Sequence, residues 1–294
     1  EEFSVGLSPG NNTFVGAAYD ETGTVFGQSN TAHLRYQPKT LKRPEMYILA
    51  VGVSNYKDKN ISLIYPSEDA KAISSALRES AKSLYGAVHI ETLLNEQASR
   101  VSIKKKLSEI AASAKSDDTV ILYFAGHGDT EKDEYYFLSY DSDITDLSRT
   151  ALAVKDLSGF AKTAAAGKIA VFLDTCKSGA AAKHIGAIAM ARGIEERKII
   201  ASLAKERGIV VFSAAGNDQS AFEISKLKHG VFTYCMLDYL KNKRNDVASN
   251  DMVSIAKLLS MVSRATRELA EKHLNVEQTP ILYVFGEDFS LGYL

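Results

Sequence analysis

From Met46 onward, continuous apolar runs alternate with amphipathic segments, and this alternation restricts the possible folds more than any other feature. Each apolar run predicts a buried strand, and these runs are 47–53, 88–93, 120–124, 169–173, 209–213 and 281–285. Segments with helical spacing separate them, at 67–82, 99–115, 154–165, 194–207, 230–242 and 252–273. Buried strands that alternate with helices are typical of a parallel sheet covered on both faces. We therefore expect an α/β fold with a mainly parallel, six-stranded sheet flanked by helices.

One of the predicted helices has a well-defined start. Ser99 is suited to cap the helix 99–115, because its side-chain oxygen can accept a hydrogen bond from a backbone N–H of the first turn. Val101, Leu107 and Ile110 are expected to share the buried stripe of this helix.

The first 37 residues have a different pattern, in which apolar and polar residues alternate between turn-forming clusters at 9–12 and 20–23. A period of two predicts a short N-terminal β segment. Two or three strands cannot bury a core of their own. We therefore expect 1–37 to be part of a β-sandwich, similar to the closing strands of an immunoglobulin-like domain, with upstream domains in a longer chain. Residues 38–44 would be a linker, and 45–294 the main domain.

The bulk composition argues against several classes of partner. A formal net charge of −1 over 294 residues gives no electrostatic attraction to nucleic acid or to an anionic membrane surface. No apolar run approaches the roughly 20 residues that a membrane-spanning helix needs. Two cysteines are too few for a disulfide framework, which favours a reducing compartment. We expect a cytoplasmic protein that binds neither nucleic acid nor membrane.

Two of the predicted strands end in reactive side chains. His127 and Cys176 each stand three residues past an apolar run, at the edge of the sheet where the sites of parallel α/β proteins lie. If these strands are neighbours, the two side chains can approach each other. A thiol with a reference pKa of about 8.5 needs a nearby imidazole or helix N-terminus to become an effective nucleophile. The alternative is a small buried Cys and a hydrogen-bonded loop His.

Six segments resemble the caspase-like C14 cysteine peptidases, most of all the bacterial relatives of metacaspases and paracaspases. They are YILAVGVSNY (47–56), YPSEDAKAI (65–73), LYFAGHGD (122–129), FLDTCKSG (172–179), VVFSAAGNDQSAFE (210–223) and HGVFTYCMLDYL (229–240). The resemblance covers about 44–294 in the correct order. The interval of 49 residues between His127 and Cys176 is also the caspase arrangement.

The resemblance implies the caspase-hemoglobinase fold and the hydrolysis of peptide bonds through a covalent thioester. It makes Cys176 the nucleophile and His127 the group that protonates the leaving amine. The backbone amides of Gly128 and Cys176 would form the oxyanion hole. No cofactor is required, although some metacaspases use calcium, so calcium dependence stays open. The acidic segment 141–145 does not settle this, because it lacks the Gly and Glu that an EF-hand loop needs.

The resemblance also implies a protein or peptide substrate with a basic residue before the cleaved bond. Metacaspases bind Arg or Lys in an acidic pocket, and the matching positions here are Asp69 and Asp174. Carboxylates suit a guanidinium because they form charge-assisted, bidentate hydrogen bonds with it. Two alternatives are a helix N-terminal charge for Asp69 and a turn residue for Asp174. A preference for Asp would need basic residues at these positions.

The sequence departs from the metacaspase pattern at two positions. Lys177 stands where a His usually follows the nucleophile, and Ala125 stands where metacaspases often have Ser. Neither change removes a reacting group. Self-cleavage is a further expectation, because Lys183 and Arg192 lie in the Ala- and Gly-rich loop 180–198. The rival hypothesis keeps the fold without catalysis, as a scaffold or interaction domain.

The remaining candidates have simpler explanations. Cys235 shares a helical stripe with Val231 and Tyr239, so it is expected in the core. His229 precedes that helix and is expected to be a loop or capping residue. The acidic loop 129–134 next to the catalytic His would either meet basic substrates or be solvated.

Overall fold

The computed structural model describes residues 10–14, 16–19, 25–36, 42–132, 134–175, 208–215, 221–242, 252–285 and 288–293. Its central sheet has six strands in the order β16-β12-β11-β7-β5-β6. In chain order they are β5 (Glu45–Gly52), β6 (Ala87–Leu94), β7 (Thr119–Gly126), β11 (Lys168–Thr175), β12 (Gly208–Ser213) and β16 (Ile281–Phe285). Neighbouring strands are parallel except β12 and β16, which are antiparallel. The predicted six-stranded, mainly parallel sheet is confirmed.

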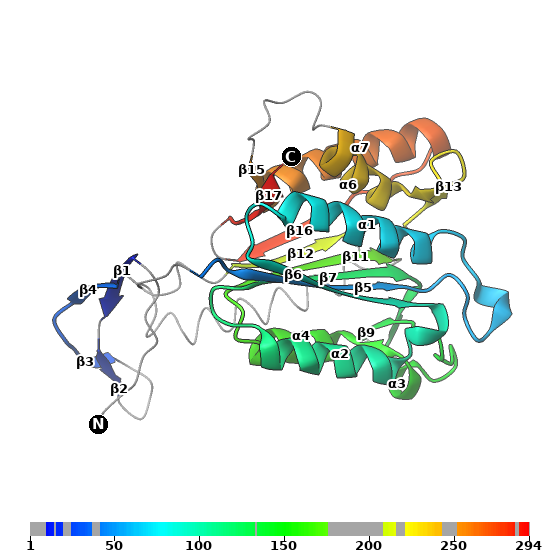
Figure 1. The fold of residues 1–294 in the computed structure, drawn as a ribbon. Helices are drawn as coiled ribbons and strands as arrows, with labels where there is room; N and C mark the ends of the chain where they lie inside the picture. The colour runs from blue at the N-terminus through cyan, green and yellow to red at the C-terminus, as the bar shows by residue number, and fades with distance from the viewer. Residues whose placement is uncertain are drawn as a thin grey trace.

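Helices cover both faces of this sheet (Figure 1). On one face lie α1 (Pro66–Ala81), α6 (Val231–Asn242) and α7 (Ile255–Leu274). On the other lie α2 (Arg100–Ser113), α4 (Val154–Thr163) and the short α3 (Leu147–Thr150). All of the predicted helices are confirmed except 194–207, which lies outside the described residues.

Side chains along each central strand alternate between two cores, as the pleat of a strand requires. In β7, Tyr123 packs into the core beneath α1 and α6, whereas its neighbour Phe124 packs into the core beneath α2 and α4. The same alternation in β11 puts Phe172 on the α1 side. Asp174, two residues further along β11, therefore faces α1 and α6 as well.

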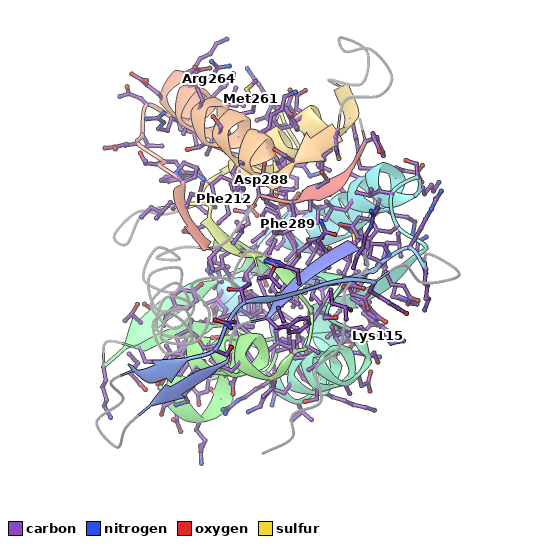
Figure 2. The ribbon with its side chains drawn as sticks, turned by 90° about the vertical axis from the view of Figure 1, so that its left-hand side faces the viewer. Lys115, Phe212, Met261, Arg264, Asp288 and Phe289 are labelled. Carbon is purple, nitrogen blue, oxygen red and sulfur yellow. The ribbon has the colours of Figure 1, made fainter. Side chains whose placement is uncertain are left out.

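Figure 2 shows these layers from the side. Met261 and Arg264 mark α7 on one side of the sheet, and Lys115, just past α2, marks the other. Phe212 of β12 lies between them at the sheet. It is buried in the core on the α7 side, where it makes an edge contact with Phe232 of α6. Burial of such aromatic rings contributes much of the stability of a core.

The start of α2 was predicted correctly, but its buried stripe was not. The Ser99 side chain accepts a hydrogen bond from the Ser102 amide, as expected of an N-cap. Leu107 and Ile110 are buried, whereas Val101 is 75% exposed. The prediction for Val101 is wrong because Ile103, with Leu107 and Ile110, forms the side that packs on the sheet.

Several short strands escaped the sequence analysis. The acidic segment expected as a loop at 129–134 belongs mostly to a hairpin of β8 (Gly128–Glu131) and β9 (Glu134–Phe137). On its other side, β9 pairs with β10 (Leu152–Ala153). Two further antiparallel pairs are β13 (Glu223–Ile224) with β14 (His229–Gly230), and β15 (Met252–Ser254) with β17 (Ser290–Tyr293). Strands of two to four residues are too short to give a periodic signal.

The N-terminal residues form the expected short β segment. Antiparallel pairs join β1 (Gly10–Phe14) to β4 (Ala32–Tyr36), and β2 (Ala17–Tyr19) to β3 (Val25–Gln28). All of β4 is exposed. Its origin in an immunoglobulin-like sandwich stays a prediction. None of the helices in the described part of the chain is long and apolar enough to cross a membrane.

Candidate active site

The carboxyl ends of β7 and β11 form one edge of the site. The two strands are parallel neighbours, and their last paired residues are Gly126 of β7 and Thr175 of β11. His127 directly follows Gly126, and Cys176 directly follows Thr175 in the sequence. The condition on which the dyad prediction depended, that the two strands are neighbours, is therefore met. Cys176 itself lies outside the described residues.

A backbone carbonyl holds the His127 ring. Its Nε2 lies 2.9 Å from the carbonyl oxygen of Ile61, in the short 3₁₀ turn η1 (Lys59–Ile61). Because a carbonyl can only accept a hydrogen bond, this contact assigns the proton of the neutral ring to Nε2. Nδ1 is then the atom free to accept a proton. Sequence analysis missed the role of Ile61, since a backbone acceptor has no signature in the residue type.

Tyr56 fixes the backbone at the same place. Its buried hydroxyl oxygen accepts a hydrogen bond from the His127 amide at 2.7 Å, and its ring lies 5.3 Å from the imidazole. Gly126, with φ of 149°, adopts a backbone conformation that suits glycine, and an added Cβ would lie 2.7 Å from the Tyr56 hydroxyl. The turn that presents His127 thus depends on both residues.

Gly128 presents its amide away from the neighbouring strand. It lies opposite Phe137 of β9, and the adjacent hydrogen bond runs from the Leu138 amide to the His127 carbonyl. In an antiparallel ladder this pattern makes Gly128 and Phe137 a pair that exchanges no backbone hydrogen bonds. The Gly128 N–H is therefore not used by β9, as an oxyanion donor requires.

Tyr135 links this hairpin to the end of β11. Its hydroxyl is hydrogen bonded to the hydroxyl of Thr175, the residue before Cys176. The ring lies so close to Gly128 that any Cβ added there would overlap it. Both Tyr135 and Thr175 are buried. The segments that carry His127 and Cys176 are thus joined through one buried phenol.

Asp69 is buried in the first turns of α1, at 2% exposure. One carboxylate oxygen is paired with Nδ1 of His229, and the other accepts a hydrogen bond from the Gly230 amide at 3.0 Å. Burial raises the pKa of this carboxyl, and the contacts with His229 and Gly230 oppose that rise. His229 was expected to be a loop or capping residue. That expectation is wrong, because its ring reaches across to α1 from β14.

Asp174 is buried at the end of β11, on the same face of the sheet as Asp69. Its Oδ2 accepts a hydrogen bond from the Thr233 hydroxyl at 2.6 Å. Burial and the nearby charge of Asp69 together raise the pKa of Asp174 to about 7. Its alternative role as an ordinary turn residue is excluded by its place in a sheet strand and by its burial.

The two aspartates line a pocket beside His127 that opens to solvent. Its empty volume, including the solvent at its mouth, is about 390 Å³. Its wall also contains a third carboxylate, Glu223 of β13, whose Oε1 accepts a hydrogen bond from the Tyr65 amide. Glu223 ends one of the segments that carried the family resemblance, yet sequence analysis did not single it out. The other lining residues are Leu63, Pro66, Ala125, Gly126, Ala221, Phe222 and Gly230.

The weaker candidates divide into three groups. Cys235 is buried in the core with Val231 and Tyr239, as predicted, and burial raises the pKa of its thiol to about 12. Asp141 and Asp143 accept hydrogen bonds from nearby backbone and hydroxyl groups, and no metal-binding cluster occurs among the described residues. Lys177, Lys183 and Arg192 lie outside the described residues.

A family model for the caspase domain, Peptidase C14, matches residues 46–287. The chain belongs to the caspase-domain family. No curated protein sequence matches it significantly. Among solved structures, this caspase domain is similar to protein GSU0716 from Geobacter sulfurreducens, with 18% identity and a TM-score of 0.54 over 83% of this chain and 94% of the other. It is also similar to caspase-1 from Spodoptera frugiperda, with 13% identity and a TM-score of 0.50 over 82% and 86% of the two chains. At these identities the solved structures show the caspase fold alone.

Proposed function

We propose that this caspase domain is a cysteine endopeptidase that cleaves peptide bonds after Arg or Lys. The observation that carries the proposal is the pocket beside His127 into which three carboxylates converge, from Asp69, Asp174 and Glu223. A buried anionic pocket next to a polarised imidazole suits a substrate with one cationic side chain close to the reacting bond.

In the proposed reaction, Nδ1 of His127 accepts the proton of the Cys176 thiol, and the thiolate attacks the scissile carbonyl carbon. The amides of Gly128 and Cys176 hold the oxyanion. The C–N bond then breaks, His127 returns the proton to the leaving amine, and a thioester remains on Cys176. Water hydrolyses the thioester to release the acid and the free thiol. The Ile61 carbonyl supports this assignment because it keeps the Nε2 proton in place.

Charge accounts for the proposed preference. A guanidinium or ammonium group entering the pocket would neutralise carboxylates that are costly to bury alone. Hydrogen bonds from Arg to carboxylates are charge-assisted and frequently bidentate, so Arg should be the better substrate. An Asp side chain would add a further negative charge among three carboxylates and should be excluded.

Self-cleavage and calcium dependence remain part of the proposal. Cleavage after Lys183 or Arg192 would produce two fragments in the wild-type protein and none in Cys176→Ala, which intact-mass analysis distinguishes. Activity assays with added calcium and with a chelator test the requirement for the ion.

Hydrolysis of matched fluorogenic peptides tests the proposed function directly. The peptides differ only in the residue before the bond: Arg, Lys, Asp, or citrulline, which has the shape of Arg without its charge. We expect cleavage after Arg and Lys, little after citrulline, none after Asp, and no activity in Cys176→Ala. Silence on every peptide, with calcium present and after processing, would contradict the proposal and favour a non-catalytic scaffold. Cleavage after citrulline as fast as after Arg would overturn the role of the carboxylates.

A further inference from the structure

We infer that one short segment, from His229 to Thr233, sets the position and charge of both pocket aspartates, with Thr233 as the positioning residue for Asp174. This inference deepens the proposed function and rests on it for the nature of the substrate. The segment comprises β14 and the first turn of α6. His229 and Thr233 are not part of the pocket wall and act from behind the carboxylates.

The first half of the segment holds Asp69. The His229 ring is paired with Oδ1 of Asp69, and the amide of the next residue, Gly230, donates to Oδ2 at 3.0 Å. Asp69 therefore has a donor on each oxygen before any substrate arrives. Since the His229 side chain is 23% exposed and Asp69 only 2%, the imidazole connects the buried carboxylate to the solvent side.

The second half of the segment holds Asp174. The Thr233 hydroxyl donates its only proton to Oδ2 of Asp174, so the Tyr123 hydroxyl, 2.5 Å from the Thr233 oxygen, must donate to Thr233. A hydrogen bond from the Thr233 backbone also reaches Asp174. Tyr123, Thr233 and Asp174 thus form a directed chain of hydrogen bonds that ends on a carboxylate and favours its charged form.

Gly230 allows the two halves to act together. A Cβ added at this residue would lie 2.9 Å from Oδ2 of Asp174 and 3.3 Å from Oδ2 of Asp69. Both carboxylates therefore approach the same Cα. A side chain at this position would take up the space that they share.

The charge of Asp174 depends on all the titratable groups around it. Among the residues that the structure describes, those on the pocket side are Asp69 of α1, Glu223 of β13 and His127 after β7. Behind the pocket they are Tyr123 of β7, His229 of β14 and Cys235 of α6. The negative neighbours oppose ionisation, and the Thr233 contact is the hydrogen bond that favours it. Removal of the Thr233 hydroxyl should therefore leave Asp174 protonated to higher pH and weaken the pocket for cations.

Substitution of Thr233 tests this role. Thr233→Val is nearly isosteric and lacks the hydroxyl, whereas Thr233→Ser retains it. Thr119→Val is the matched control, because Thr119 is also buried and bonded to a tyrosine hydroxyl, Tyr85, but lies at the opposite end of β7. For each protein, kcat and KM for the Arg peptide are measured from pH 5.5 to 8.5. Binding of butylguanidinium and of neutral butylurea is measured by calorimetry, and the titration of Asp174 is followed by carboxyl NMR.

We expect Thr233→Val to raise the titration midpoint of Asp174 by about one pH unit, which leaves roughly fivefold less of the ionised form at pH 7. KM for the Arg peptide and the dissociation constant of butylguanidinium should rise by a similar factor, with a smaller change in kcat. Thr233→Ser should restore both values. Thr119→Val should move neither midpoint nor KM, whatever its effect on stability.

The outcomes separate this inference from the proposed function. If the wild type cleaves after Arg and Thr233→Val leaves the midpoint and KM unchanged, the inference is wrong and the proposed function stands. If the wild type neither cleaves nor binds butylguanidinium, but the Asp174 midpoint still rises in Thr233→Val, the proposed substrate class is wrong and the role of Thr233 stands. Equal shifts in Thr119→Val would reduce the effect to general loosening of the fold and overturn the inference.

Discussion

At the scale of single residues, the pocket shows how surroundings differentiate two identical side chains. Asp69 is paired with an imidazole and a backbone amide, whereas Asp174 is bonded to a neutral hydroxyl and lies close to another carboxylate. Burial raises the pKa of both carboxyls. A carboxyl that ionises near neutral pH is typical of functional sites, where burial and neighbouring charges are arranged to shift pKa values.

The raised pKa of Asp174 predicts that ionisation destabilises the fold. Its pKa is about 7 in the folded state, against about 3.9 for an unperturbed Asp, so the folded state binds the proton more tightly. The contribution of the protonated Asp174 to the free energy of unfolding is therefore fully present below pH 4. It falls as the pH rises from 4 to 7 and stays constant above that. Asn cannot ionise, so the free energy of unfolding of Asp174→Asn should not fall in this way as the pH rises from 4 to 7. At pH 7 it should exceed the wild-type value by on the order of a few kcal/mol, at about 1.4 kcal/mol per pKa unit.

Urea unfolding of both proteins at pH 4.5, 6 and 8 measures this difference. A gap between the two free energies of unfolding that does not change with pH would show that Asp174 ionises in the folded state as it does in the unfolded chain. Asp69→Asn is a useful comparison, because loss of its negative charge should lower the pKa of Asp174 and reduce the pH dependence.

At the scale of elements, the ends of the strands carry the chemistry and short segments between them align it. The η1 turn supplies the acceptor for His127, the β8–β9 hairpin supplies Tyr135, and β14 with α6 holds the aspartates. The η1 turn, the hairpin and β14 produce no strong sequence pattern, whereas the helical spacing of 230–242 predicts α6. Their places follow from the sheet, since parallel strands deliver all their carboxyl ends to one edge.

The helix α2 provides a prediction in which sequence and structure disagree. Val101 is 75% exposed and Leu107 is 4% exposed on the same helix. Val101→Ala should change the free energy of unfolding by less than about 0.5 kcal/mol, as surface substitutions usually do. Leu107→Ala should cost about 2–5 kcal/mol because it leaves a cavity in the core. Chemical denaturation of the two variants checks this, and similar losses would mean that Val101 is buried after all.

At the scale of the whole molecule, the two cores that stabilise the described fold begin at Met46. Among the residues whose burial the structure describes, both hydrophobic clusters consist of residues from β5 onward. The residues just before β5 are docked, since Arg43 donates to the Ser83 carbonyl and the Gly86 amide donates to Pro44. Arg43 and Pro44, which the sequence analysis places at the end of the linker, thus contact the segment between α1 and β6.

Removal of residues 1–41 should leave the caspase domain intact. A protein that starts at Lys42 retains these contacts and both cores, so its melting temperature should stay within about 2 °C of the full chain, less than the 2–4 °C shift expected per kcal/mol at this size. Its peptidase activity, once detected in the full chain, should be unchanged. A large loss of either would show that the N-terminal strands stabilise the domain.

The six buried strands, five of the six predicted helices and the strand ends that bear His127 and Asp174 could be predicted from the sequence alone. These are local signals, because hydrophobic runs and helical spacing depend only on neighbouring residues. The resemblance located Asp69 in advance, although α1 lies far from β11 in the chain.

The contacts that these residues make became known only from the three-dimensional fold. It joined His229 to Asp69 across 160 residues, brought Glu223 to the pocket wall, and used the Ile61 carbonyl to orient His127. Backbone acceptors and long-range ion pairs have no local pattern, since they depend on which elements the fold brings together. Burial has the same origin: the sheet and two helices remove Asp174 from water, and that desolvation, with the charge of Asp69, raises its pKa.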